Sequence, residues 1–231
     1  MPVTLIGLDA DDPLWHNETL FRLTHERFNA LLADFASPAE LEDRLEAVER
    51  RNLCLYGYGA KGFTLSMLET ALEVSGGRAP AGVLQEILAA GREMMAHPVE
   101  PLPGVPEALE VLATKAQLVL VTKGDLFHQE TKLAASGLGD FFSGVEIVSE
   151  KTADTYRRVF SRYAVDPAQA LMAGYSVRSD VLAPLEAGAW AALIPYPLVW
   201  SHEAAEVPTN HPRFRELASL AELPAWVEAI S

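Results

Sequence analysis

The feature that most constrains this chain is a change in the spacing of its apolar residues. From about residue 17 to residue 95, apolar residues recur at helical spacing and no strand-like run occurs. After His97-Pro98, short apolar runs alternate with helical segments. These strand-like runs are Gln117–Val121, Val145–Val148, Ala170–Ala173 and Ala191–Ile194. Strands separated by helices predict a parallel sheet with helices on both faces.

One more strand is predicted before the helical stretch, over Val3–Leu8. The chain has 231 residues, a length that suits a core domain with a smaller insertion. We therefore predict an open Rossmann-like α/β core from residues 1–15 and 97–231, and an α-helical cap domain from residues 16–96. The proline-rich segment Tyr196–Arg213 is predicted to be an irregular loop, and Phe214–Ile230 to add a terminal helix.

The charge of the chain limits its possible binding partners, and its cysteine content limits its possible covalent links. Its net charge is −14, from 18 basic and 32 acidic side chains, so we expect no nucleic-acid partner and no anionic membrane partner. Cys54 is the single cysteine, which excludes a disulfide within the chain. The first residues lack a basic segment typical of a signal peptide, and no apolar run reaches the roughly 20 residues that cross a bilayer. We expect a cytoplasmic protein, and a homodimer stays open.

Polar side chains follow the predicted strands where a parallel sheet gathers its carboxyl ends. They are Asp9 and Asp11, then Thr122-Lys123-Gly124, then Lys151, and then Asp180 after Gly174-Tyr175-Ser176. Ligands of open α/β sheets bind at that edge. Each residue alone is weak evidence, because an Asp-x-Asp pair also caps turns and a single lysine is usually solvated. Their order along one edge is what predicts a site.

That order resembles the four motifs of the haloacid dehalogenase-like (HAD) hydrolase superfamily, in a phosphatase-like subgroup with an α-helical cap after the first strand. The motifs of this chain read LIGLDADDPLW, QLVLVTKGD, SEKTADTYRRVF and LMAGYSVRSDV. The resemblance covers essentially the whole chain.

The resemblance implies a magnesium-dependent phosphatase that hydrolyses a small phosphorylated metabolite through an aspartyl-phosphate. Carboxylates and a backbone carbonyl suit Mg²⁺, and a carboxylate needs a cation beside it to attack a phosphate dianion. The implied roles are Asp9 as nucleophile, Asp11 as general acid and base, Thr122, Lys123 and Gly124 as phosphoryl ligands, Lys151 as the catalytic cation, and Mg²⁺ bound by the side chains of Asp9 and Asp180 and the main-chain oxygen of Asp11.

Two alternatives stay open. A haloacid dehalogenase releases halide, which needs no proton, whereas the leaving alkoxide of a phosphate ester does; the acidic Asp11 therefore favours phosphoester chemistry. The chain also departs from the family pattern at Pro13, where Thr or Val is usual, and at Tyr175, where Asp or Asn is commoner. A catalytically weak or silent HAD-like binding protein is the alternative that these two changes suggest.

The predicted cap contains one segment that departs from helical spacing. Arg50–Asn52 and Tyr56–Phe63 interrupt the pattern, and glycines alternating with aromatics in the second stretch predict a shaped loop. Since cap loops choose the substrate in the resembling proteins, Tyr58 and Lys61 are the candidates for substrate contact. The alternative is a plain connector between helices with a solvated lysine.

Overall fold

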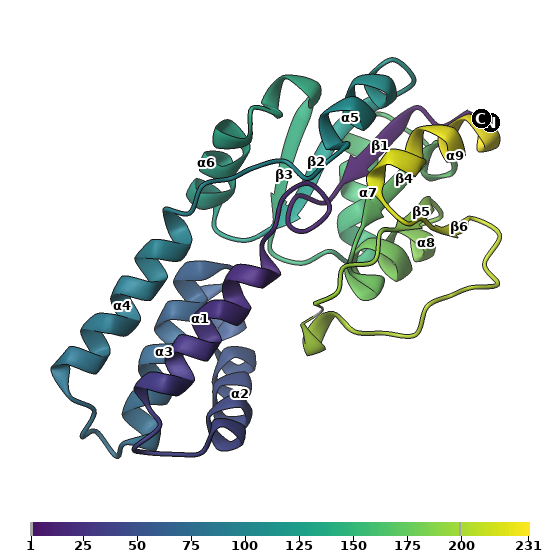
Figure 1. The fold of residues 1–231 in the computed structure, drawn as a ribbon. Helices are drawn as coiled ribbons and strands as arrows, with labels where there is room; N and C mark the ends of the chain where they lie inside the picture. Colours follow the sequence, from purple (N-terminus) through teal and green to yellow (C-terminus); the bar gives the residue numbers. More distant parts are fainter. Residues whose placement is uncertain (1, 199) are drawn as a thin grey trace. The chain divides into compact units, whose positions relative to one another are not determined.

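The parallel sheet predicted from the sequence is present. The computed structural model describes residues 2–198 and 200–231, and within them six strands form one sheet in the order β3-β2-β1-β4-β5-β6, with every neighbouring pair parallel (Figure 1). The strands are β1 (Leu5–Leu8), β2 (Gln117–Lys123), β3 (Gly144–Val148), β4 (Ala170–Gly174), β5 (Trp190–Leu193) and β6 (Phe214–Glu216).

Helices cover both faces of this sheet, because its strands are apolar on both sides. In β1, Ile6 and Leu8 belong to the apolar cluster that also holds residues of α5 and α9, whereas Leu5 belongs to the cluster built on α7. Such a sheet, buried on both faces, explains why its strands read as continuous apolar runs. The helices of this part are α5 (Val105–Ala113), α6 (Leu126–Ser136), α7 (Ala153–Arg162), α8 (Ala183–Glu186) and α9 (Leu223–Ile230).

The insertion after β1 is helical, with its own apolar core. Its helices are α1 (Glu18–Leu31), α2 (Pro38–Tyr56), α3 (Ala60–Val74) and α4 (Ala81–Met95). Phe28, Leu45 and Met67 are among the fully buried side chains that join these helices. Helix α2 begins with a capping box, in which the Ser37 hydroxyl accepts the backbone N–H of Glu40 and the Glu40 carboxylate accepts that of Ser37, with Pro38 in the first turn.

The chain divides into two compact units. The core unit comprises residues up to 18, 99–123 and 129–231, and the helical unit comprises residues 19–98 and 124–128. The predicted boundaries, after residues 15 and 96, lie two or three residues from these. The prediction missed that the segment 124–128 groups with the helical unit. Lys61 of α3 makes an ion pair with Asp125 at 2.8 Å in this unit.

Two local predictions were wrong. Arg50–Asn52 lies inside α2, where Asn52 is buried against α3, so that only Gly57–Gly59 separates α2 from α3. Phe214–Glu216 is not helical but adds the edge strand β6, because Ala191 pairs with Phe214. The segment before it is irregular in its described residues, as predicted, apart from a 3₁₀ turn at Ser201–Glu203. Within the described ranges, no helix has the length and apolar character needed to span a membrane.

Candidate active site

Three predicted residues meet in a buried charge cluster at the carboxyl edge of the core unit's sheet. Asp9 follows β1, Lys151 precedes α7, and Asp180 lies in the π-helical turn Val177–Leu182 after β4. The ammonium of Lys151 lies 2.7 Å from Oδ1 of Asp9 and 2.7 Å from Oδ1 of Asp180. Asp180 is completely buried, and Lys151 and Asp9 are each only 5% exposed. The strand order alone therefore brings these three side chains together.

The backbone around the cluster explains why Asp180 sits against the sheet. A Cβ atom on Gly174 would lie 2.3 Å from Oδ2 of Asp180, so this strand end needs glycine. The same Oδ2 accepts a hydrogen bond from the backbone N–H of Ser176 at 3.1 Å. Next to it, the Tyr156 hydroxyl donates to the carbonyl of Ser179 at 2.9 Å and fixes the turn to α7.

The charges of this cluster do not balance. Two carboxylates share the single ammonium of Lys151. Burial, together with repulsion from Asp180, raises the pKa of Asp9 to about 8 even though Lys151 opposes the shift. Burial alone would lower the pKa of Lys151, but the two carboxylates raise it instead, so the lysine stays charged. The cluster thus has two carboxyl groups for one ammonium.

Asp11 points to a separate set of donors. Its Oδ1 accepts from Lys132 Nζ at 2.5 Å and from Trp15 Nε1 at 2.7 Å, and its Oδ2 accepts from Gln129 Nε2 at 3.0 Å. Burial would raise the pKa of Asp11, but the charge and hydrogen bond of Lys132, with the bonds from Gln129 and Trp15, hold it below its usual value. Asp11 is therefore a carboxylate in this structure.

Asp12, the third acidic residue of the first motif, stabilises the start of α1. Asp12 is buried and accepts the backbone N–H groups of Asn17 at 2.9 Å and Glu18 at 3.1 Å, at the start of α1. Its φ of 74° is one that Asp tolerates better than most residues. Burial raises the pKa of Asp12 to about 7. Pro13 follows in the same buried turn.

Thr122 and Lys123 end β2 beside this site but face different partners. Thr122 is buried, and its Oγ1 accepts from Gln129 Nε2 at 2.8 Å. Lys123, predicted to bind phosphoryl oxygens, instead pairs with the carboxylate of Glu203 and lies 3.2 Å from Ser179 Oγ. An ammonium paired with a buried carboxylate offers a phosphate less charge, and contact of Lys123 with phosphoryl oxygens stays a prediction.

Glu203 is a buried acid that the sequence did not single out. It is 3% exposed, and besides Lys123 it accepts the hydroxyls of Ser176 and Ser179, each at 2.5 Å. Although burial opposes ionisation, Lys123 and the two hydroxyls lower the pKa of Glu203 to about 2. The ion pair therefore ties the segment before β6 to the turn that carries Asp180.

Tyr175 contacts another aromatic ring and also lies near several carboxylates. Its ring meets that of Tyr196 edge-on at 6.3 Å between centroids, and the Tyr196 hydroxyl lies 2.7 Å from His16 Nδ1. The Tyr175 hydroxyl lies 3.5 Å from Glu18 Oε1. Burial and the nearby carboxylates, Glu18 first, raise the pKa of Tyr175 well above its usual value, so it is a neutral phenol.

The remaining predicted substrate contacts belong to the helical unit. Gly124 is part of the segment 124–128, and its φ of 131° requires glycine. Tyr58 is half-buried in the connector between α2 and α3. Lys61 lies at the start of α3, pairs with Asp125, and lies 5.8 Å from the ring centre of Phe127. Contact of Tyr58, Lys61 or Gly124 with a substrate stays a prediction.

The donor set at Asp9 and Asp180 fits a hard divalent cation. In the part of the chain that the structure describes, no three His, Cys, Asp or Glu side chains gather closely enough to hold a metal by side chains alone. Mg²⁺ does not need them, because it commonly takes one or two carboxylates and keeps several waters. Two carboxyl groups beside one ammonium leave oxygen donors that can accept a further cation. The residues therefore fit Mg²⁺, with the Asp11 carbonyl as the predicted third protein ligand.

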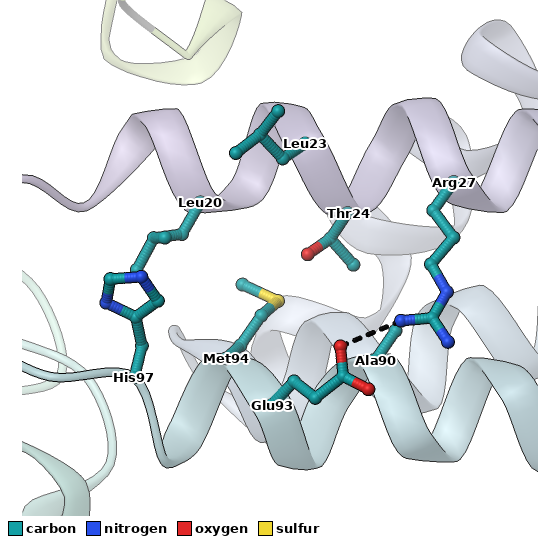
Figure 2. A pocket seen from close by; sticks show the side chains of 8 residues that line it. All are labelled: Leu20, Leu23, Thr24, Arg27, Ala90, Glu93, Met94 and His97. Carbon is teal, nitrogen blue, oxygen red and sulfur yellow. Dashed lines mark hydrogen bonds and ion pairs between the residues drawn. The ribbon is translucent and has the colours of Figure 1, made fainter.

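A hollow of about 240 Å³ lies elsewhere, between α1 and α4 of the helical unit (Figure 2). Figure 2 shows Arg27 reaching across it to Glu93, with which it pairs at 2.8 Å. The residues lining it are Leu20, Leu23, Thr24, Arg27, Ala90, Glu93, Met94 and His97. None of the predicted catalytic residues lines this hollow, so it is not the candidate active site.

Sequence reasoning missed the residues that surround the predicted ones. Gln129 and Lys132 lie three residues apart on α6 and thus share one helix face, but no motif marks them. Glu203 lies in the segment predicted to be an irregular loop. The one available signal was the DADD run, which contains Asp12.

Comparison with known proteins agrees with this architecture. Residues 3–188 match the model of the family described as haloacid dehalogenase-like hydrolases. A solved haloacid dehalogenase-like family hydrolase from Xanthomonas campestris is 42% identical, with a TM-score of 0.89 over 99% of this chain and 91% of the other. The chain belongs to the haloacid dehalogenase-like hydrolases. No protein of curated function matches it.

More distant structures share the fold, but their names describe different reactions. One is a predicted phosphoglycolate phosphatase from Haemophilus somnus, with 18% identity, a TM-score of 0.65 and 97% coverage of both chains. Another is the L-2-haloacid dehalogenase of Xanthobacter autotrophicus with chloropropionic acid covalently bound, with 17% identity, a TM-score of 0.65 and coverage of 99% of this chain and 100% of the other. At such identity the likeness shows the fold, and the substrate class must be argued from the site.

Proposed function

We propose that this hydrolase is a magnesium-dependent phosphatase of small phosphorylated metabolites, working through an aspartyl-phosphate on Asp9. One observation carries the proposal. A buried nucleophile candidate, Asp9, shares one ammonium with Asp180, while a second acid two residues on, Asp11, is held by its own donors. This arrangement supplies a nucleophile, a place for a cation, and a separate group for proton transfer.

The reaction has two steps. A carboxylate oxygen of Asp9 attacks phosphorus, the bond from phosphorus to the leaving oxygen breaks, and Asp11 in its acid form gives that oxygen a proton. Water then attacks the aspartyl-phosphate and gives a proton to the Asp11 carboxylate, so that inorganic phosphate leaves and both acids return to their starting forms. The second step uses the form of Asp11 that the structure contains.

The other residues stabilise charge. Bound Mg²⁺ supplies positive charge that offsets both the phosphate dianion and the attacking carboxylate. Asp9 and Asp180 would hold it by their side chains. Lys151 keeps its proton between the two carboxylates and would offset negative charge that develops on the phosphoryl group. Thr122 and the backbone that follows it end β2 at the same edge and would bind phosphoryl oxygens.

Asp11 is the reason for proposing a phosphatase rather than a dehalogenase. Halide is a stable leaving group that needs no proton, and an acid at position 11 would then have no task. The Asp11 carboxylate is instead held by three donors, two of them buried side chains of α6. The charge of −14 supports a small-molecule substrate over nucleic acid, and a cytoplasmic location is part of the same proposal.

A panel of small phosphorylated metabolites, with para-nitrophenyl phosphate as an activated substrate, tests the function with and without Mg²⁺. We expect phosphate release that requires Mg²⁺, is lost in Asp9→Asn, and is kept in Asp140→Asn, a matched change at an exposed acid. A parallel assay measures halide release from chloropropionic acid. Halide release without phosphate release would replace the proposal by a dehalogenase, and no turnover of either class would favour a silent binding protein.

A further inference from the structure

The side chain of Lys132 makes the closest contact to the proposed proton-transfer group Asp11. Lys132 is 8% exposed, which is unusual for a lysine, and its ammonium lies 2.5 Å from Oδ1 of Asp11. Its other hydrogen bond, to Asn17 Oδ1, is 3.4 Å long. The lysine is therefore buried chiefly against one carboxylate oxygen.

The two oxygens of Asp11 are held unequally. Oδ1 accepts two N–H donors, from Lys132 and from Trp15, which occupy both of its lone pairs. Oδ2 accepts one, from Gln129 at 3.0 Å. The Gln129 amide has only two hydrogens for three acceptors, and its contacts with the Lys123 carbonyl at 2.6 Å and with Thr122 Oγ1 at 2.8 Å are shorter. Oδ2 is thus the less firmly held oxygen.

The Gln129 amide also fixes which way Oδ2 faces. Because the same nitrogen contacts Thr122 Oγ1 at the end of β2, Oδ2 lies on the side of Thr122. β2 is the neighbour of β1, the strand that leads into Asp9. Rotation of the carboxylate would exchange its oxygens, and the two donors on Oδ1 resist that rotation.

We propose that Lys132 is a positioning residue that, with Trp15, anchors Oδ1 of Asp11 and so presents Oδ2 as the oxygen that exchanges a proton with the leaving group and with water. This inference rests on the proposed phosphatase function. Lys132 touches neither substrate nor phosphorus; it acts through Asp11. Its removal therefore affects reactions in proportion to their need for a proton on the leaving oxygen.

Two substrates of nearly equal shape test this dependence. Phenyl phosphate has a leaving oxygen that needs a proton, whereas para-nitrophenyl phosphate needs one much less. In Lys132→Met we expect kcat on phenyl phosphate to fall ~10-fold or more, within the range of general acid catalysis, with a much smaller fall on para-nitrophenyl phosphate and little change in KM. Lys132→Arg should restore most of the loss. In Asp11→Asn, the added Lys132→Met should cause no further fall.

Lys115→Met is the matched control, since Lys115 pairs with Glu228 on the surface and lies outside the site. If Lys132→Met does not fold, Lys132→Gln carries the same comparison. Equal losses on both substrates, or losses that multiply in the Asp11→Asn background, would overturn the positioning role while leaving the phosphatase intact. Absence of turnover by the wild-type protein on both substrates would overturn the phosphatase and this inference with it.

Discussion

Among the charged groups of the core unit that the structure describes, two clusters differ in how completely their charges are matched. In the first, Asp9 and Asp180 share Lys151, and the pKa of Asp9 rises to about 8. In the second, Lys123 and Glu203 pair one to one and the pKa of Glu203 falls to about 2. Asp9, Lys151, Asp180 and Glu203 are buried, and the Lys123 side chain is 13% exposed.

We propose that this difference separates a catalytic site from a structural ion pair. A matched pair with its remaining lone pairs satisfied by Ser176 and Ser179 is stable as it stands. An unmatched carboxylate is costly to bury and persists where a cation or a reaction uses it. We therefore assign chemistry to the Asp9 cluster and structural support of the Asp180 turn to the Glu203 cluster. The following predictions test that assignment.

The largest effect is expected for Asp9→Asn. Loss of the nucleophile should reduce kcat by on the order of 10⁴-fold or more, as for other catalytic nucleophiles. Because the change also removes the unmatched charge, the unfolding free energy should stay equal or increase. Phosphate-release assays and urea unfolding, side by side with Asp140→Asn, measure both. A strongly destabilised Asp9→Asn protein would show that the cluster is structural as well.

Glu203→Gln should have the opposite effects: a loss of stability with activity largely kept. It leaves Lys123 buried without its carboxylate, and breaking such a pair costs about 3–5 kcal/mol of unfolding free energy. Urea unfolding compared with Glu216→Gln, a change at an exposed acid of β6, measures the loss. Activity per folded molecule should change much less than in Asp9→Asn. A Glu203→Gln protein that is stable and inactive would reverse the roles that we give the clusters.

Low pH should remove the stabilisation that the Lys123–Glu203 ion pair gives the wild-type protein. The pKa of Glu203 is lowered from 4.5 to about 2 on folding, so its contribution is complete above pH 4.5 and is lost as the pH falls towards 2. A shift of this size corresponds to about 3 kcal/mol. The difference in unfolding free energy between wild type and Glu203→Gln should therefore shrink over that pH range. A difference independent of pH would contradict the pairing.

Mg²⁺ should stabilise only the unmatched cluster. A ligand that binds the folded state alone adds about 2.7 kcal/mol when its concentration is 100 times its dissociation constant. Thermal unfolding of the wild-type protein should shift upward with Mg²⁺, whereas Asp180→Asn should show little shift and Glu203→Gln should keep it. An equal shift in Asp180→Asn would place the cation elsewhere.

The sequence predicted the parts of this site that depend on strand order. Parallel strands bring their carboxyl ends to one edge, so Asp9 and Asp180 were expected together once the strands were recognised. Lys151 was expected beside them because it follows β3, a strand of the same parallel sheet. The sheet and its helices could be predicted because buried strands are read from apolar runs that depend only on local sequence.

The missed features depend on contacts between distant segments. Lys132 and Gln129 matter because α6 packs beside the turn after β1, and the spacing of residues on α6 does not contain that information. The pairing of Lys123 with Glu203 could not be predicted, because Glu203 lies 80 residues away in a proline-rich stretch. Strand β6 is too short, at 3 residues, to give an alternating pattern.

The most direct test of the account is to trap the aspartyl-phosphate. The wild-type protein, mixed with Mg²⁺ and an activated aryl phosphate, is quenched with borohydride, which reduces an acyl phosphate to an alcohol, and its peptides are analysed by mass spectrometry. We predict homoserine in place of aspartate at position 9, dependent on substrate and absent from Asp9→Asn. Turnover with an unmodified Asp9, or with the label at Asp11 or Asp180, would contradict the account.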